Sequence, residues 1–134
     1  MIVLDEQLLG RQLQPSIAAW YRGAVCSVTD LRPGTLIRDD AIPTLLAKQR
    51  QPSFITINIS HFWRRTRADR RFCIVCFKLL DRDVPKISDL LRLLLRNRNF
   101  SAKAQRAGYV FRVNLDEQVQ FYNYDNEDIQ HFQL

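Results

Sequence analysis

The sequence predicts a single α/β domain with three layers, α/β/α, and a mainly parallel central sheet. A chain of 134 residues is long enough for one hydrophobic core but not for two. It starts with a continuous apolar run, Ile2 to Leu4, which is typical of a strand buried on both faces in a parallel sheet covered by helices. Helical and strand patterns then alternate along the chain, as this fold class requires.

The first half of the chain contains two expected helices and two further strands. Apolar residues at three- and four-residue spacings predict helices over 7–21 and 41–50, with a strand over 24–28 and a loop over 29–38 between them. Asp39 and Asp40 precede the second helix, and we expect one of them to cap it. A third strand, rich in β-forming residues, is expected over 53–58.

The second half contains the most apolar strand and the clearest helix. We place the strand over 72–80 at the centre of the sheet because of its hydrophobicity. Ile87, Leu90, Leu91 and Leu94 form one apolar stripe and predict a helix. Strands over 109–113 and 119–122 are expected to form a C-terminal β-hairpin or paired edge strands. The domain is therefore expected to span residues 1–122, followed by an acidic, aromatic tail over 123–134.

Charge is unevenly distributed along the chain. Residues 61–112 carry 14 basic and 4 acidic side chains, a net charge of +10, whereas residues 113–134 carry 5 acidic and no basic ones. A region this basic, and rich in arginine, favours binding to polyanions such as nucleic acid. The opposite charges also suggest a hypothesis in which the acidic tail folds back over the basic surface as an internal inhibitor.

The cysteines and hydropathy restrict the classes of protein. Three cysteines without a framework spacing favour reduced thiols and a cytoplasmic protein. Cys73 and Cys76 lie within one apolar strand, where alternation would turn their sulfurs to opposite faces, so neither a redox nor a zinc site is expected. No apolar run approaches the roughly 20 residues of a membrane span, and no membrane association is expected.

Oxygen-bearing side chains follow the ends of several expected elements. They are Asp5 and Glu6 after the first strand, Asp39 and Asp40 at a helix start, and Asn58 and Ser60 after the third strand. Ligands in open α/β sheets bind beyond the carboxyl ends of the strands. Hard oxygen ligands at such an edge suit Mg²⁺ or Mn²⁺, which activate water and neutralise charge in phosphodiester cleavage. We therefore expect these six residues to form a metal site beside the arginine-rich loop.

The order of these parts resembles a known family. A strand ending in L-D-E, a helix, a second strand, D-D-A-I near a helix start and then F-I-T-I-N are similar to the compact PIN-like nucleases, which include VapC-type toxin ribonucleases. The resemblance covers about residues 1–77. It implies a Mg²⁺- or Mn²⁺-dependent endoribonuclease, with Asp5, Asp40 (or Asp39) and Asn58 at the catalytic positions and Thr56 at the family's motif threonine. It also implies an antitoxin protein as partner.

The third motif departs from the family pattern. The family has aspartate where this chain has Asn58, followed by Ser60 and His61. An amide oxygen can bind a metal but brings no negative charge. Three alternatives stay open: weaker metal binding, a contribution from His61, or loss of catalysis.

The leading hypothesis is a metal-dependent ribonuclease, with Asp5 as main ligand, Asp40 as second, and Glu6, Asp39 and Asn58 in support. We expect the RNA to be bound by Thr56, His61, Trp63, Arg64, Arg65, Arg67, Arg70 and Arg71, with Phe62 or Trp63 stacking on a base.

Two other classes of function remain. One is a nuclease-like module that has lost its metal and binds RNA or a partner protein without cleaving. The other is an assembly subunit, such as a homodimer, in which the basic region of one copy binds the acidic tail of its neighbour.

Overall fold

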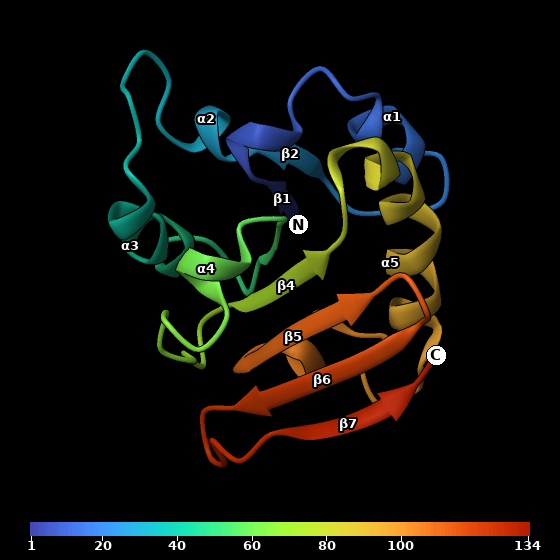
Figure 1. Cartoon of the computed structure of the whole chain (residues 1–134). Helices are drawn as coiled ribbons and strands as arrows, with labels where there is room; N and C mark the ends of the chain where they lie inside the picture. The colour runs from blue at the N-terminus through green and yellow to red at the C-terminus, as the bar shows by residue number, and fades with distance from the viewer.

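Seven strands form one sheet in the order β2-β1-β3-β4-β5-β6-β7 in the computed structural model, which describes residues 1–134 (Figure 1). The strands from β2 to β5 are parallel, and β6 and β7 are antiparallel additions. The strands are β1 (Ile2–Leu4), β2 (Val25–Ser27), β3 (Ser53–Thr56), β4 (Cys73–Lys78), β5 (Tyr109–Asn114), β6 (Gln118–Asn123) and β7 (Gln130–Gln133). The expected α/β class with a mainly parallel sheet is confirmed, and β4 is the central strand as predicted.

Helices pack on both faces of this sheet. They are α1 (Leu13–Ala18), α2 (Val28–Leu31), α3 (Ile42–Ala47), α4 (Ile59–Phe62), α5 (Ile87–Arg96) and α6 (Lys103–Arg106), with 3₁₀ turns η1 (Glu6–Leu8), η2 (Asp39–Ala41) and η3 (Asp81–Lys86). One hydrophobic cluster joins α1 and α5 to the sheet, and a second joins α2, α3 and α4 to it. The chain therefore has two hydrophobic clusters, one on each face of the single sheet, where one core was expected.

The clearest predicted helix is α5. Its buried side chains, Ile87, Leu90, Leu91 and Leu94, form the expected stripe, while Arg92 and Arg96 are exposed. Cys73 and Cys76 belong to different clusters and so lie on opposite faces, as alternation predicted. Burial raises the pKa of both thiols, that of Cys73 to about 12.

Two local expectations differ from the structure. The helix expected over 7–21 is split, because Gly10 (φ 70°) and Gln12 (φ 63°) adopt left-handed conformations and only Leu13–Ala18 is α-helical. Part of the expected loop over 29–38 is instead the single turn α2. Its start is stabilised by the Ser27 hydroxyl, which accepts from the Thr29 N–H, and by the Asp30 carboxylate, which accepts from the Ser27 N–H.

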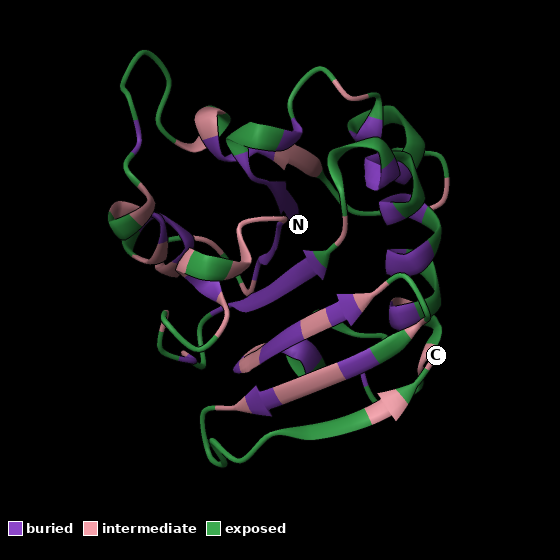
Figure 2. Cartoon of the chain, in the orientation of Figure 1, coloured by how far each residue is buried: buried purple, intermediate pink, exposed green.

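The C-terminal segment is not a tail but ends in an edge strand. The hairpin β5–β6 forms as expected, and β7 then pairs with β6, so the predicted boundary between residues 122 and 123 falls within β6. Phe132 packs against Phe100 and Phe121, with ring centroids 5.8 and 5.7 Å apart. This aromatic contact explains why the segment joins the sheet, although Figure 2 shows β7 as largely exposed.

The order of the five parallel strands locates a crevice. The chain passes from β1 outward to β2 and then returns across β1 to β3, so the direction of winding reverses between β1 and β3. In doubly wound sheets, ligands bind beyond the carboxyl ends of the strands at such a reversal.

None of the helices has the length and the apolar composition that crossing a membrane requires.

Candidate functional site

Asp5 lies at the reversal point, directly after β1, and is 3% exposed. The Thr56 hydroxyl at the end of β3 donates a hydrogen bond to Asp5 Oδ2 over 2.6 Å, and the Glu6 N–H donates to Oδ1 over 2.7 Å. Burial raises the pKa of the Asp5 carboxyl, these two bonds oppose the shift, and the charges of Asp39 and Glu6 add to it. Asp5 is therefore a buried carboxyl group held in one orientation.

Asn58 links the end of β3 to the η2 turn. Its backbone N–H donates to Thr56 Oγ1 over 3.0 Å, and its side-chain Nδ2 donates to Asp39 Oδ2 over 3.1 Å. Its side-chain oxygen accepts from the Ser60 hydroxyl and the His61 N–H, capping α4. A continuous hydrogen-bond network thus runs from Asp5 to Asp39.

Asp39 and Asp40 do not act as helix caps, in contrast to the prediction. The N-cap residues are Arg38 for η2 and Ala41 for α3, and neither makes a side-chain capping bond. Asp39 instead faces the His61 ring, with its Oδ2 3.9 Å from Nδ1. Asp40 is exposed and lies outside the network, as does the exposed side chain of Glu6. The structure thus joins Asp5, Asp39, Asn58 and Ser60 and leaves Asp40 apart.

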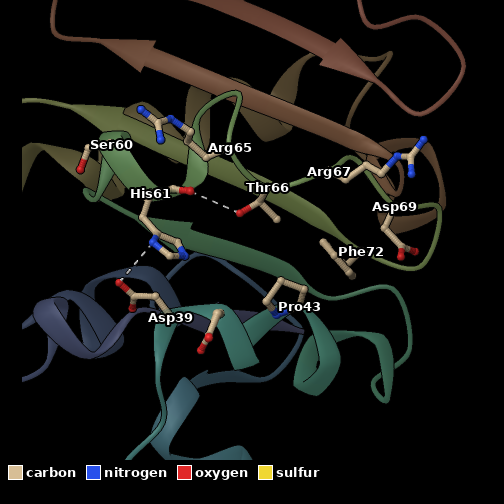
Figure 3. Close-up of a pocket in the computed structure, with 10 residues that line it drawn as sticks. Asp39, Pro43, Ser60, His61, Arg65, Thr66, Arg67, Asp69 and Phe72 are labelled. Carbon is tan, nitrogen blue, oxygen red and sulfur yellow. Dashed lines mark hydrogen bonds and ion pairs between the residues drawn. The ribbon is translucent and has the colours of Figure 1, made fainter.

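A polar pocket of about 570 Å³ adjoins this network (Figure 3). It lies between the start of α3 and the loop that follows α4. Its lining includes Asp39, Asp40, Ser60, His61, Arg65, Arg67 and Asp69. In Figure 3, Asp39 and His61 lie on one side, and Arg67 and Asp69 on the other. Asp5 does not line the pocket but connects to it through Thr56, Asn58 and Asp39.

The five loop arginines fall into two groups. Arg65 and Arg67 are exposed, line the pocket and have no hydrogen bond or ion pair within the chain. Arg71 forms a two-pronged ion pair with Asp69. Arg64 and Arg70 reach the C-terminal segment, Arg64 through the Glu127 carbonyl at 2.6 Å and Arg70 through the Asp125 carboxylate at 3.1 Å. Only Arg65 and Arg67 are free to bind an anion without breaking a contact.

Two residues expected at the RNA surface are instead inside the protein. Thr56 and Phe62 are fully buried, so neither can contact RNA, and Thr56 serves instead to orient Asp5. Trp63 is half-buried and packs against Tyr122, with ring centroids 5.2 Å apart. The His61 side chain is 40% exposed and is available for base stacking at this surface.

The contacts of Asp125 and the Glu127 carbonyl with the loop arginines agree with the hypothesis that the acidic segment folds over the basic surface, but the individual partners and the role of Asp69 were not expected. The spacing of Asp69 two residues before Arg71 could have shown the local pair, since an aspartate often bonds the backbone two residues on, as Asp69 does here. The other contacts depend on the β6–β7 turn, whose position the local sequence does not specify.

The carboxylate oxygens of the network are ligands of the type that a hard divalent cation binds, but they are few. Each Asp5 oxygen accepts one hydrogen bond and retains a lone pair, and the Asp39 carboxylate lies nearby. No group of three or more His, Cys, Asp or Glu side chains is arranged to hold a metal. Mg²⁺ commonly uses only one or two carboxylates and keeps several waters, so two carboxylates are enough in number for such an ion.

Comparison with protein-family models, curated proteins and solved structures found no match to this chain.

Proposed function

We propose that the protein is a metal-dependent ribonuclease whose site lies at the carboxyl end of β1 and β3. One observation carries the proposal. Two carboxyl groups, Asp5 and Asp39, are joined by a hydrogen-bond network at the sheet reversal, and Asp39 lines a polar pocket with two unpaired arginines. Metal-dependent phosphodiester cleavage uses both elements, since carboxylates bind the cation and arginines bind phosphate.

The roles of the residues follow from their contacts. Asp5 and Asp39 would hold Mg²⁺ or Mn²⁺, which when bound supplies an activated water and neutralises phosphate charge. Thr56 positions Asp5 through its 2.6 Å hydrogen bond, and Asn58 positions Asp39. Arg65 and Arg67 would bind the RNA backbone across the pocket. The toxin role and the antitoxin partner implied by the sequence resemblance stay predictions.

A second function, RNA binding without cleavage, is favoured by one specific contact. The side-chain oxygen of Asn58 already accepts hydrogen bonds from Ser60 and His61, so this residue cannot bind a metal without releasing the cap of α4. Where the resembled family has a third acidic position, this chain has a structural residue. The two arginines would still bind RNA in such a module.

Cleavage of a mixed RNA pool with Mn²⁺, Mg²⁺ or EDTA tests both functions. The nuclease predicts cutting by the wild-type protein with metal, loss of cutting in Asp5→Asn, and unchanged cutting in Asp89→Asn, which removes an exposed carboxylate on α5. Gel retention in EDTA, with an Arg65→Gln and Arg67→Gln double variant, measures RNA binding separately.

The outcomes separate the two functions. Intact RNA in every reaction, with retention that the double variant weakens, would replace the nuclease by the binding module. Equal cutting by wild type and Asp5→Asn would remove the site from the reaction and contradict the proposed function.

A further inference from the structure

A second pocket lies at the opposite end of the sheet, on the face covered by α1 and α5, which pack side by side (Figure 1). Its volume is about 370 Å³, within the range of small-molecule sites. The residues after α1 supply Trp20, Tyr21 and Arg22, α5 supplies Arg92 and Arg96, and the turn after α5 supplies Ser101.

The pocket concentrates positive charge without compensation. The side chains of Arg22, Arg92 and Arg96 are exposed, and none of them forms a hydrogen bond or ion pair within the chain. No carboxylate lines the pocket. Three guanidinium groups around one hollow match the oxygens of a phosphate group, which arginine binds in a two-pronged geometry.

A buried charge behind the pocket strengthens the preference for an anion. Arg106 is 1% exposed and has no acidic partner. Its Nη1 donates to the carbonyls of Phe100 and Ser101 at 3.0 and 2.9 Å, and its Nε donates to the Ser53 hydroxyl at 3.0 Å. Ser101 lines the pocket, so this permanently charged group lies directly behind the pocket wall.

Two aromatic rings in the pocket are held in place. The Trp20 Nε1–H donates to the Ser88 hydroxyl at 3.0 Å. The Tyr21 ring lies over Gly23 so closely that a Cβ there would be 2.7 Å from Cε2 of the ring. The two rings meet edge to face, with centroids 6.0 Å apart. Fixed aromatic side chains beside arginines are suited to a flat base attached to a phosphate.

We propose that this pocket binds a nucleoside phosphate, with the phosphate on Arg22, Arg92 and Arg96 and the base against Trp20 or Tyr21. The ligand is either a free nucleotide or a nucleotide of an RNA strand, since both present the same chemistry. The proposal goes beyond the proposed function and does not depend on it, because Asp5 and the loop arginines take no part.

Titration calorimetry with AMP, inorganic phosphate and a short RNA, all in EDTA, tests the site. The test variant is Arg92→Gln with Arg96→Gln. The matched control is Arg98→Gln with Lys103→Gln, which removes two exposed positive charges nearby but outside the pocket. The test variant should bind AMP about tenfold more weakly or worse, whereas the control should stay close to wild type.

A further variant tests the aromatic contact. Gly23→Ala displaces the Tyr21 ring, an adjustment of a side chain that the fold should tolerate. It should weaken AMP binding more than phosphate binding. Competition between RNA and AMP would identify a nucleotide in a strand as the source, and binding of AMP alone would identify a free nucleotide.

Three results would overturn the proposal. They are the lack of saturable AMP binding by the wild-type protein, equal losses in the test and control double variants, and phosphate binding as tight as that of AMP. The second result would indicate a general attraction of the basic surface for anions, and the third would exclude the base contact.

Discussion

The two ends of the sheet each bury one charged side chain without an ion-pair partner. At the carboxyl end this is Asp5, held by the Thr56 hydroxyl and the Glu6 N–H. At the amino end it is Arg106, held by the Ser53 hydroxyl and two carbonyls. Burial of an unpaired charge is costly in both cases, and only hydrogen bonds to neutral groups offset the cost here.

The two groups differ in whether they can lose their charge. A carboxyl group can bind a proton, and burial raises the pKa of Asp5 accordingly. A guanidinium group keeps its charge at every ordinary pH. One end of the sheet is thus suited to take up a cation, and the other can be compensated only by an anion. This contrast agrees with a metal site at Asp5 and a phosphate site near Arg106.

The largest expected effect is that of removing the buried cation. Arg106→Leu leaves the Ser53 hydroxyl and the carbonyls of Phe100 and Ser101 without their donor, which should lower the free energy of unfolding by about 3 kcal/mol. Urea denaturation followed by circular dichroism measures the change. The exposed Arg98→Leu serves as control and should change stability by less than about 0.5 kcal/mol. A loss below about 1 kcal/mol in Arg106→Leu would show that desolvation of the cation cancels its hydrogen bonds.

A second prediction concerns the buried acid and pH. Because the folded state raises the pKa of Asp5 above its ordinary value of 3.8, protonation stabilises the native protein. This contribution is fully present below pH 3.8 and is lost as the pH rises through the raised pKa. Asp5→Asn lacks the titration, so the free energy of unfolding of wild type should fall relative to that of the variant between acid and neutral pH.

Denaturant unfolding of both proteins across this pH range gives the comparison. Thr56→Val provides a second measure, because it removes the hydrogen bond that favours the charged carboxyl and should shift the decline to higher pH. Parallel curves for wild type and Asp5→Asn would mean that Asp5 has the same pKa in the folded and unfolded chain.

The parts of the fold that the sequence predicted are those with a strong local pattern. The apolar stripe of α5 and the apolar run of β4 predict that these elements are buried. The apolar run Ile2–Leu4 predicts that Asp5 lies at a strand end. The membership of β7 depends on Phe132 reaching Phe100 and Phe121, which lie far away in the chain. The same applies to the site. The hydrogen bonds from Thr56 to Asp5 and from Asn58 to Asp39 join residues far apart in the chain, so a local sequence pattern does not predict them.

The smallest expected effect concerns the acidic segment that contacts the arginine loop. The Arg70–Asp125 pair is 3.1 Å long, with side chains 70% and 79% exposed, so Asp125→Asn should change stability by well under about 1 kcal/mol. It should nevertheless raise RNA affinity at low salt, because the Arg70 guanidinium, which lies over the Tyr124 ring, then has no carboxylate partner. The matched control is Asp128→Asn, which removes the same charge from the same segment but contacts no arginine. Gel retention in EDTA that improves only in Asp125→Asn would show that the segment competes with RNA through this one contact, whereas equal improvement in both variants would reduce its role to net charge.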